Sequence, residues 1–408
     1  MEKVVVIGGG AAGMIAAGTA ASRGKEVILL EKNEKLGKKI YITGKGRCNI
    51  TNTGDIEELL TNVTDNKNFL YSAFYSFSNE DIIQLLHKYG TPTKVERGNR
   101  VFPVSDKSSD VIKALTRFME SYHVDIRLNC EVIDILIDQE SVIGVKLKDQ
   151  SIIHCSSVII ATGGLSYPTT GSTGDGYRFA KAVGHQIIPL KPALVPLETE
   201  EAWTHELQGL SLKNVRLTAY YTNKEVYSDL GEMLFTHFGI SGPIVLSMSN
   251  YINKYLDNGK ILVTLDLKPG LDDEKLDRRI QKDFEKYSRK QFKNALDDLL
   301  PSKIIPQIIG LSGISPEKNV HQITKDERKK LISLLKHLEI HILRTRPIKE
   351  AVVTSGGIQI KEISPSSMES KLVKGLFFAG EVIDVSALTG GYNLQIAFST
   401  GYLAGMNA

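Results

Sequence analysis

The sequence predicts an α/β fold built on a parallel sheet, and three segments support this prediction. Residues 4–7 form a short β-branched run, as a buried parallel strand requires, and residues 27–30 form a second. Between them, the Ala-rich segment 11–22 has good helix propensity. Near the other end, the apolar run 376–378 leads through glycines into a small-residue segment. This order indicates a Rossmann-like domain that is completed by both ends of the chain.

A glycine-rich turn separates the first strand from the first helix. The six residues that begin at Gly8 read GGGAAG and fit the pattern G-x-G-x-x-G. Gly8 permits a tight turn, Gly10 lets the backbone approach a pyrophosphate, and Gly13 lets helix and strand pack closely. The helix N-terminus at Ala11 and Ala12 presents free N–H groups and a positive dipole end to phosphates. The turn therefore predicts a dinucleotide site.

An acidic residue stands at the end of the second strand, where such a site needs one. Glu31 follows Gly13 by 18 residues, and its carboxylate can accept hydrogen bonds from the adenosine ribose hydroxyls. The next residue, Lys32, is a further candidate contact of the cofactor. This N-terminal unit alone does not distinguish NAD from FAD.

The C-terminal segment favours FAD. Residues 376–381 form an apolar strand that ends in Ala-Gly-Glu, and the glycine pair 390–391 precedes a closing helix. The N–H groups and dipole at the start of such a helix can stabilise negative charge on a reduced flavin. We therefore predict FAD as the cofactor. The predicted contacts from this segment are Gly380, Glu381, Asn393, Leu394 and Gln395.

A third strand-like segment supports the same interpretation. Residues 158–163 are an apolar run that ends in Ala-Thr-Gly, which flavoproteins often place near the dinucleotide, so Thr162 and Gly163 are candidate contacts. The stretches before it are short and alternate, as in a small antiparallel meander. They are residues 124–136, 142–147 and 152–154. Within them, Val132 lies where such proteins hold adenine through backbone groups.

Four ordered motifs resemble one bacterial flavoprotein family. The first reads GKKI and TGKGRCNITN within residues 37–52, and the second reads GGLSYP and GSTGDG within 163–176. The third reads GEMLFTHFGISGP at 231–243, and the fourth is the C-terminal segment 380–401, which begins with Gly-Glu. The family that they resemble includes aminoacetone oxidase, the BaiN-type bile-acid reductases and a ribosomal-RNA dihydrouridine synthase. The resemblance spans nearly the whole chain.

The resemblance implies a non-contiguous architecture. The FAD-binding domain would comprise residues 1–190 and 351–408. Between its two parts the resemblance implies a β-barrel substrate domain over 191–270, a helical insert over 271–337 and a return segment of the barrel over 338–350. We therefore expect an α/β flavoprotein of the two-dinucleotide-binding-domain type, with an inserted small barrel and helical domain.

The segment Arg47-Cys48-Asn49 is the first candidate for chemistry at the flavin. An arginine beside the isoalloxazine can stabilise the reduced anion, and Asn49 can hydrogen-bond a ring edge. Cys48 is either a small buried residue that packs by the flavin or a proton donor to a substrate carbon. Lys39, in the preceding motif, is a further candidate contact of the cofactor.

His237 is the second catalytic candidate. It lies in a glycine-rich loop, where functional residues are common, and it either serves substrate binding and proton transfer or shapes the loop. The remaining histidines are scattered, and the three cysteines stand far apart without metal-ligand spacing. We therefore expect no metal site.

The resemblance implies, as the leading function, NAD(P)H-fed reduction of a conjugated C=C bond, in an enone-like small molecule or in uridine of ribosomal RNA. The sequence has no second G-x-G-x-x-G after a strand, so NADH or NADPH would bind only transiently at the flavin. Basic residues of the insert could contact RNA phosphates. They are Lys325, Arg328, Lys329, Lys330, Arg344 and Arg346. Two alternatives stay open, an oxidase of a small amine such as aminoacetone and a non-catalytic flavin-binding protein.

Composition and charge indicate a globular protein, and we expect a cytoplasmic location without a membrane partner. The chain of 408 residues is 42% hydrophobic and 24% charged, with a net charge of only +3. No apolar stretch approaches the roughly 20 residues of a membrane span. The first residues run straight into a strand and lack the features of a signal peptide.

Overall fold

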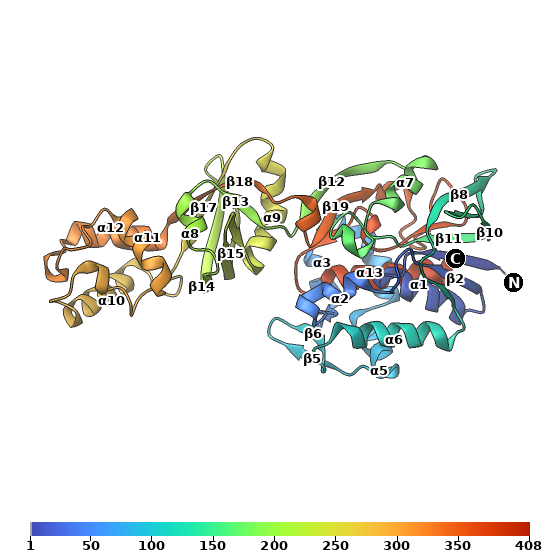
Figure 1. Cartoon of the computed structure of the whole chain (residues 1–408), viewed down its shortest axis with the longest axis horizontal. Helices are drawn as coiled ribbons and strands as arrows, with labels where there is room; N and C mark the ends of the chain where they lie inside the picture. Colours follow the sequence, from blue (N-terminus) through green and yellow to red (C-terminus); the bar gives the residue numbers. More distant parts are fainter. Residues whose placement is uncertain (1) are drawn as a thin grey trace. The chain divides into compact units, whose positions relative to one another are not determined.

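A computed structural model describes residues 2–408 of the chain, which form two compact units (Figure 1). Unit 1 comprises Met1–Ala193 and Pro347–Ala408, so it is built from both ends of the chain. Unit 2 comprises Leu194–Arg346 and is inserted between the two parts of unit 1.

A five-stranded parallel sheet forms the centre of unit 1, with the strand order β20-β11-β1-β2-β7. The strands are β1 (Lys3–Ile7), β2 (Glu26–Leu30), β7 (Asp125–Arg127), β11 (Ser157–Ile160) and β20 (Leu376–Phe378). The apolar runs of β1, β2, β11 and β20 are buried on both faces, as a parallel sheet requires, whereas the edge strand β7 is more exposed. The glycine turn follows the end of β1, so it lies at the carboxyl edge of this parallel sheet. Because β1 is the middle strand, the turn lies at the centre of that edge, where open α/β folds bind ligands.

Two helices of small residues pack against each other beside this sheet. They are α1 (Ala11–Ser22) and α13 (Tyr392–Asn407). A Cβ atom on Gly401 of α13 would lie 2.4 Å from the carbonyl oxygen of Ala12, so the two backbones are in direct contact. On α1, a Cβ on Gly18 would lie 2.3 Å from the Phe118 ring. The small residues of both helices therefore set how closely this layer packs.

An antiparallel meander lies beside the parallel sheet. Its strands are β8 (Val132–Asp138), β9 (Ser141–Leu147) and β10 (Ile152–His154). The sequence prediction that 124–136 belongs wholly to the meander was wrong, because β7 at its start pairs with β2 in the parallel sheet. Asn129 adopts a left-handed conformation with φ of 53° and breaks the stretch between β7 and β8.

Smaller elements complete unit 1. Three small sheets pair β12 (Ile187–Ala193) with β19 (Val353–Ile358), β4 (Val63–Asp65) with β21 (Ser386–Ala387), and β6 (Arg100–Pro103) with β3 (Thr51–Asn52) and β5 (Thr93–Glu96). The remaining helices are α2 (Lys38–Ile42), α3 (Ile56–Thr61), α4 (Tyr71–Ser76), α5 (Asn79–Lys88), α6 (Ser108–Ser121) and α7 (Asp175–Ala182). The pairing of β12 with β19 joins the two sequence segments of unit 1.

A closed six-stranded barrel forms one part of unit 2. Its strands, in order, are β13 (Leu197–Thr199), β16 (Gly239–Ser241), β15 (Lys224–Thr236), β14 (Ser211–Tyr221), β17 (Ile261–Asp266) and β18 (Leu338–Thr345). In β17, Ile261, Val263 and Leu265 are fully buried and alternate with partly exposed residues, as in a filled small barrel. Two helices join the strands, α8 (Ala202–Glu206) and α9 (Pro243–Leu256).

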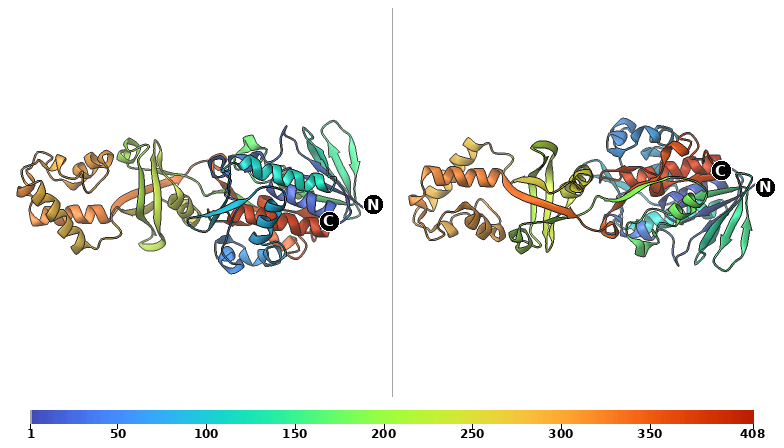
Figure 2. Two further views of the ribbon diagram at one scale, coloured as in Figure 1. Left: turned by 90° about the horizontal axis from the view of Figure 1, so that it is seen from below. Right: turned by 90° about the horizontal axis from the view of Figure 1, so that it is seen from above.

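A group of helices forms the other part of unit 2, drawn in orange tones in Figure 2. They are α10 (Asp273–Lys286), α11 (Ile305–Ser312) and α12 (Lys325–Lys336). The helices and the barrel share one continuous apolar core, so the predicted border between them at residue 270 stays a prediction. The predicted fold class, a Rossmann-like α/β domain with an inserted barrel and helices, is confirmed. Among residues 2–408, no helix has both the length and the apolar character needed to cross a membrane.

A methyl group added at Gly401 should destabilise unit 1 by about 1–3 kcal/mol, because it would press on the Ala12 carbonyl. Gly310 in α11 is the matched control, since no heavy atom lies within 4 Å of its Cβ position. Gly310→Ala should therefore stabilise by up to about 1 kcal/mol through helix propensity. Denaturant unfolding measures both. A Gly401→Ala variant as stable as the parent would contradict the close packing of α1 and α13.

Candidate functional site

A deep cavity in unit 1 opens at the carboxyl edge of the parallel sheet. It contains about 1330 Å³ of space free of protein atoms, partly open to solvent. The predicted site residues that line it are Gly8, Gly10, Ala11, Ala12, Glu31, Lys32, Lys39, Val132, Thr162, Gly163, Gly380, Glu381, Asn393 and Leu394.

The glycine turn after β1 forms a cradle at one end of this cavity. Gly8 has φ of 104°, and a Cβ there would lie 2.6 Å from the Ala161 carbonyl oxygen. Gly13 lies outside the lining because its α-carbon faces Gly8, where a Cβ would come within 1.9 Å of the carbonyl oxygen. At Gly10 a Cβ would meet no heavy atom within 4 Å. The backbone is therefore closely packed at Gly8 and Gly13, whereas Gly10 leaves free space on the cavity side.

Helix α1 presents an uncompensated positive end to the cavity. Its N-cap is Gly10, which has no side chain to accept from the first N–H groups, and its first turn contains no acidic residue. The N–H groups of the first helical turn have no partner within a helix, and those of Ala11 and Ala12 belong to cavity-lining residues. This end of the cavity therefore favours an anion such as a pyrophosphate.

The Glu31 carboxylate is oriented by the backbone on both sides. Its Oε2 accepts from the Gly9 N–H at 2.8 Å, and its Oε1 accepts from the Asn33 backbone N–H at 2.8 Å and from Asn33 Nδ2 at 2.6 Å. The residue is only 8% exposed but lines the cavity. A carboxylate held in this way can still accept from ligand hydroxyls, because each oxygen has more than one acceptor position.

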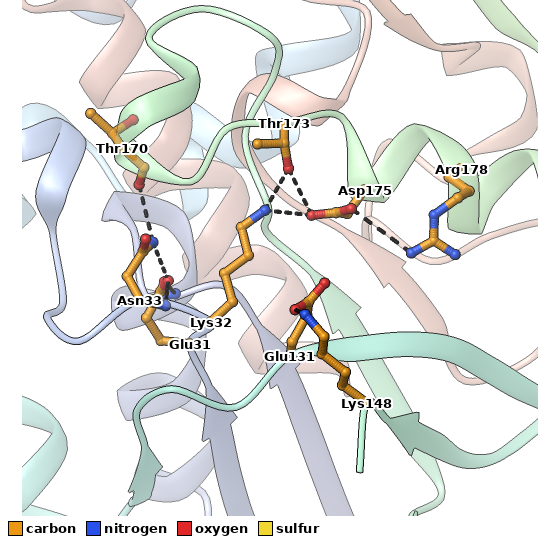
Figure 3. Close-up of polar contacts among 10 residues, drawn as sticks. Glu31, Lys32, Asn33, Glu131, Lys148, Thr170, Thr173, Asp175 and Arg178 are labelled. Carbon is orange, nitrogen blue, oxygen red and sulfur yellow. Dashed lines mark hydrogen bonds and ion pairs between the residues drawn. The ribbon is translucent and has the colours of Figure 1, made fainter. Parts of the chain in front are cut away.

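The segment after β2 is tied to the loop before α7 (Figure 3). Lys32 Nζ lies 2.6 Å from Asp175 Oδ2 and also donates to Thr173, and Asn33 Nδ2 donates to the Thr170 carbonyl at 3.2 Å. Burial alone would raise the pKa of Asp175, but the hydrogen bonds from Lys32 and Thr173 outweigh burial and lower it. Thr173 and Asp175 were not predicted as site residues, and the GSTGDG motif that contains them is the sequence signal that could have identified them.

A second polar network lies at the junction of α2, β19 and the turn after β20. Lys39 Nζ lies 2.5 Å from Glu381 Oε2 and 2.6 Å from Ser166 Oγ. Glu381 Oε1 in turn accepts from Ser166 Oγ at 2.9 Å and from the Thr354 N–H at 2.8 Å. The charges of Lys39 and Glu381 therefore compensate each other beside the cavity, and the network holds the walls that these elements form.

The N-terminus of α13 faces the same cavity as that of α1. Its first turn has no acidic residue and no side-chain cap, and Asn393 and Leu394 line the cavity. Gly391 precedes the helix with φ of 100°, and a Cβ there would lie 2.4 Å from the Thr51 backbone. With its amide oriented for hydrogen bonding, Asn49 accepts from the Gly391 N–H at 3.0 Å. Asn49 thus supports the helix start from outside the lining.

Arg47 lies outside the cavity lining and is held by other side chains. Its guanidinium donates to Asp106 at 2.6 and 2.9 Å and to Glu96, and it stacks 4.3 Å from the Phe102 ring centre. The hydrogen bonds with Glu96 and Asp106 raise the pKa of Arg47. A direct contact of Arg47 with a flavin stays a prediction.

Cys48 and Gln395 are also buried outside the lining. The Cys48 backbone has φ of 62°, and burial raises the pKa of its thiol to about 12. Gln395 accepts from Thr51 Oγ1 at 2.7 Å and donates to Ser399 Oγ at 2.9 Å and the Phe77 carbonyl at 3.2 Å. These contacts make Gln395 part of the packing of α13, and its contact with the cofactor stays a prediction.

His237 lies in unit 2, on the exposed turn between β15 and β16. Its ring packs edge-on against Phe238 at 4.9 Å, and Arg346 lies over the Phe238 ring at 4.6 Å. Its proposed roles in substrate binding or proton transfer stay predictions.

Also in unit 2, Glu201 bonds the His341 ring at 2.7 Å beside Glu200. Glu200 itself pairs with Lys260, so this cluster is satisfied by the chain's own groups.

The chemistry of the cavity fits a phosphate-containing flavin dinucleotide. Two helix N-termini without acidic residues line it, which suits the pyrophosphate at one and a negatively charged ring at the other. Thr162 Oγ1 is buried beside the cavity and has no hydrogen-bond partner among residues 2–408. A buried hydroxyl without a partner is costly, so a ligand group or water is expected to satisfy it.

Comparison with known proteins gives matches over the whole chain. The family described as "HI0933-like protein Rossmann domain" matches residues 2–407. The ribosomal RNA dihydrouridine synthase of Escherichia coli is 32% identical over 398 residues, with 98% of this chain and 96% of that protein covered. The 3-dehydro-bile acid delta(4,6)-reductase of Clostridium scindens is 31% identical over 411 residues, with 100% and 99% covered. The ribosomal RNA dihydrouridine synthase of Haemophilus influenzae is 34% identical over 409 residues, with 99% and 97% covered.

Solved structures with the same fold are more distant in sequence. The 3-ketosteroid delta1-dehydrogenase of Sterolibacterium denitrificans has a TM-score of 0.54 at 12% identity, with 99% of both chains covered. The E. coli quinol fumarate reductase chain FrdA has a TM-score of 0.51 at 16% identity, with 100% of this chain and 70% of that chain covered. At these identities the likeness concerns the fold alone.

Removal of the Glu31 carboxylate should weaken FAD binding about tenfold or more, because hydrogen bonds to a charged group contribute about 1.5–3 kcal/mol. Titration of the apoprotein with FAD, followed by flavin fluorescence, measures the affinity of Glu31→Ala. The control is Glu26→Ala, which removes an exposed carboxylate at the other end of β2 that pairs with Lys3. Equal affinities for the two variants would remove Glu31 from the cofactor site.

The three cysteines should differ in alkylation, since only Cys130 lines the cavity. Burial raises the thiol pKa values of Cys48 and Cys155 to about 12 and about 11, so both stay protonated until the pH approaches those values. Burial also raises the pKa of Cys130, but this residue lines the cavity, so iodoacetamide near pH 8.5, the ordinary thiol pKa, should modify it first, and FAD should slow this modification. Peptide mass spectrometry measures the rates. Rapid labelling of Cys48 in the folded protein would contradict its burial.

Proposed function

The chain belongs to the HI0933-like Rossmann-domain family, and from this premise we propose that it reduces a conjugated C=C bond of uridine in ribosomal RNA. The resemblance inferred from the four motifs is thereby confirmed, and the chain is an FAD-dependent oxidoreductase. The electron donor in this proposal is NADH or NADPH. FAD binding to the cavity of unit 1 supplies the reaction centre.

One observation carries the proposal: relatives that match this chain from end to end have names that describe one chemistry. A dihydrouridine synthase adds hydrogen to the C=C bond beside a carbonyl in the uracil ring. A delta(4,6)-reductase of a 3-dehydro-bile acid removes C=C bonds conjugated with a ketone. In both cases hydride adds to an electron-poor carbon and a proton adds to its neighbour.

Exposed lysines on α12 favour RNA over a steroid as the substrate. Lys325, Lys329 and Lys330 are exposed and form no ion pair among residues 2–408. In contrast, Arg328 pairs with Asp277, and Arg344 bonds Glu198 at 2.6 Å. Three of the six basic residues predicted for RNA contacts are therefore available for phosphates, whose neutralisation dominates RNA affinity.

The chain's own residues would hold the cofactor by its charged and polar groups. The turn from Gly8 to Gly10 and the N-terminus of α1 would bind the pyrophosphate, and the Glu31 carboxylate would accept from ribose hydroxyls. The chemistry that FAD supplies when bound is hydride transfer between a nicotinamide and a substrate carbon. The N–H groups at the start of α13 would stabilise the negative charge that the two-electron reduction places in this region.

The proton for the second carbon needs a donor that reaches the substrate. Cys48 carries a proton throughout the neutral range, because burial raises its pKa to about 12, but its side chain is fully buried. His237 is exposed on its turn in unit 2. Cys48 and His237 are therefore two alternative proton donors, and single substitutions distinguish between them.

Anaerobic mixing with NADH or NADPH should bleach the visible band of the holoenzyme. Addition of unmodified ribosomal RNA transcript should restore the band and form dihydrouridine, detected by mass spectrometry as a gain of H₂. If Cys48 or His237 donates the proton, Cys48→Ala or His237→Gln should slow reoxidation by RNA and leave bleaching unchanged. Cys48→Ser tests whether a hydroxyl restores the step.

Two results would refute this proposal. Bleaching by aminoacetone but by neither nicotinamide, with fast reoxidation in air, would identify an amine oxidase. Reoxidation by a steroid enone but not by RNA would leave the chemistry in place and replace the substrate.

A further inference from the structure

A second hollow lies within unit 2, where the barrel and the helices meet. It contains about 890 Å³ of space, much of it open to solvent. Its walls come from α8, the end of α11, one face of α12 and the start of β18. The lining residues are Trp203, Leu311, Ser312, Lys330, Ser333, Leu334, His337, Leu338 and Glu339.

An aromatic and aliphatic surface forms one part of this hollow. Trp203 is the single tryptophan of the chain, and it is half-buried against Phe235, with ring centres 6.1 Å apart. Leu311 is 45% exposed, and Leu334 is partly buried beside it in the lining. A flat ring placed here would cover apolar surface that now contacts water, which is favourable.

One face of α12 supplies the polar part. Lys330, Ser333 and Leu334 have the spacing i, i+3 and i+4, so they lie along one side of the helix, and His337 follows at its C-cap. Lys330 is exposed at the hollow, and Lys329 is exposed next to it on the same helix. The residues 271–350 contain 18 Lys and Arg against 13 Asp and Glu, a net charge of 18 − 13 = +5. Positive charge thus adjoins the stacking surface.

We propose that this hollow binds an unpaired nucleobase of single-stranded RNA, stacked on Trp203, with an adjacent phosphate on Lys330. A stacking aromatic ring beside lysines is the combination that binds single-stranded nucleic acid. The inference rests on the proposed RNA substrate and adds the region that recognises it. The Glu339 carboxylate and the Ser333 hydroxyl provide polar groups for the edge of the base.

The combined chemistry separates this ligand from others. A steroid or another neutral apolar molecule would gain nothing from Lys329 and Lys330, and a double-stranded helix would bury its bases away from Trp203. An unpaired nucleotide uses both features at once, since its base has a flat face for stacking and its ribose carries a phosphate.

The single tryptophan makes the test direct, because emission excited selectively from tryptophan, and not from the 15 tyrosines, reports on this hollow. Titration of the holoenzyme with a single-stranded RNA of about ten nucleotides should quench Trp203 emission, and the blunt duplex of the same sequence should not. Anisotropy of the labelled RNA should show binding weakened about tenfold in Trp203→Ala. Trp203→Phe should restore part of that loss, and thermal unfolding identifies any variant whose fold is damaged.

The lysine is tested by salt dependence. Lys330→Gln should lower the slope of log affinity against log salt by about 1, since one phosphate contact is lost. The matched control is Lys224→Gln, which removes an exposed charge at the start of β15 and should leave the slope unchanged. RNA binding without fluorescence quenching, or equal slopes for both variants, would overturn the inference.

The failure of this inference is distinguishable from failure of the proposed function. Dihydrouridine formation with no effect of Trp203→Ala or Lys330→Gln on RNA affinity would overturn the stacking site alone. Quenching by RNA together with the predicted losses, in a protein that reduces no uridine, would support the site and refute the reductase activity.

Discussion

The direct contact of backbones around α1 is the constraint on which the cavity depends. At Gly13 a Cβ would come within 1.9 Å of the Gly8 carbonyl, and at Gly401 within 2.4 Å of the Ala12 carbonyl. Only glycine allows β1, α1 and α13 to approach so closely. This packing lets residues of both helix N-termini line one cavity. A side chain at either position would move an N-terminus, and with it the N–H groups that would hold the cofactor.

The electrostatic pattern around the cavity follows from the same arrangement. Neither helix carries an acidic residue in its first turn, so neither positive end is neutralised by the chain itself. The acidic side chains nearby are already engaged, Glu31 by backbone N–H groups, Glu381 by Lys39 and Asp175 by Lys32. Positive helix ends without counter-charge and carboxylates with fixed orientation are the complement of a ligand with negative phosphates and neutral sugar hydroxyls. Neither the uncompensated helix ends nor the oriented carboxylates would be expected in a hydrophobic core that binds no ligand.

Local patterns made the framework of this fold predictable, whereas long-range contacts did not. The turn from Gly8 to Gly13 and the position of Glu31 follow from a few adjacent residues, and the structure brings Gly8 and Glu31 to one cavity. The contacts of Asn33 with Thr170 and of Ser166 with Glu381 join residues 137 and 215 positions apart, and no periodicity encodes such pairs. The sequence also did not show which motif residues line the cavity and which ones support its walls from outside.

Arg47 and Gln395 illustrate that second limit. Both were expected at the cofactor because of their neighbours in sequence. Arg47 pairs with Glu96 and Asp106, and Gln395 is fully buried with Thr51 and Ser399 as partners, so the contact of each with the cofactor stays a prediction. A polar residue in a conspicuous motif can serve the packing of the element that carries it, and the sequence motif does not reveal which role it has. The orientation of the side chain, set by the tertiary structure, decides between them.

A single dinucleotide fingerprint constrains how a reductase with two substrates can work. The sequence has no second G-x-G-x-x-G, so the nicotinamide and the reducible substrate would meet the flavin in turn at the same face. Neither can then bind so tightly there that it excludes the other. An RNA substrate would resolve this conflict, because contacts remote from the reacting ring can supply its affinity and hold it through the exchange. A base-stacking site in unit 2 would supply part of this remote affinity.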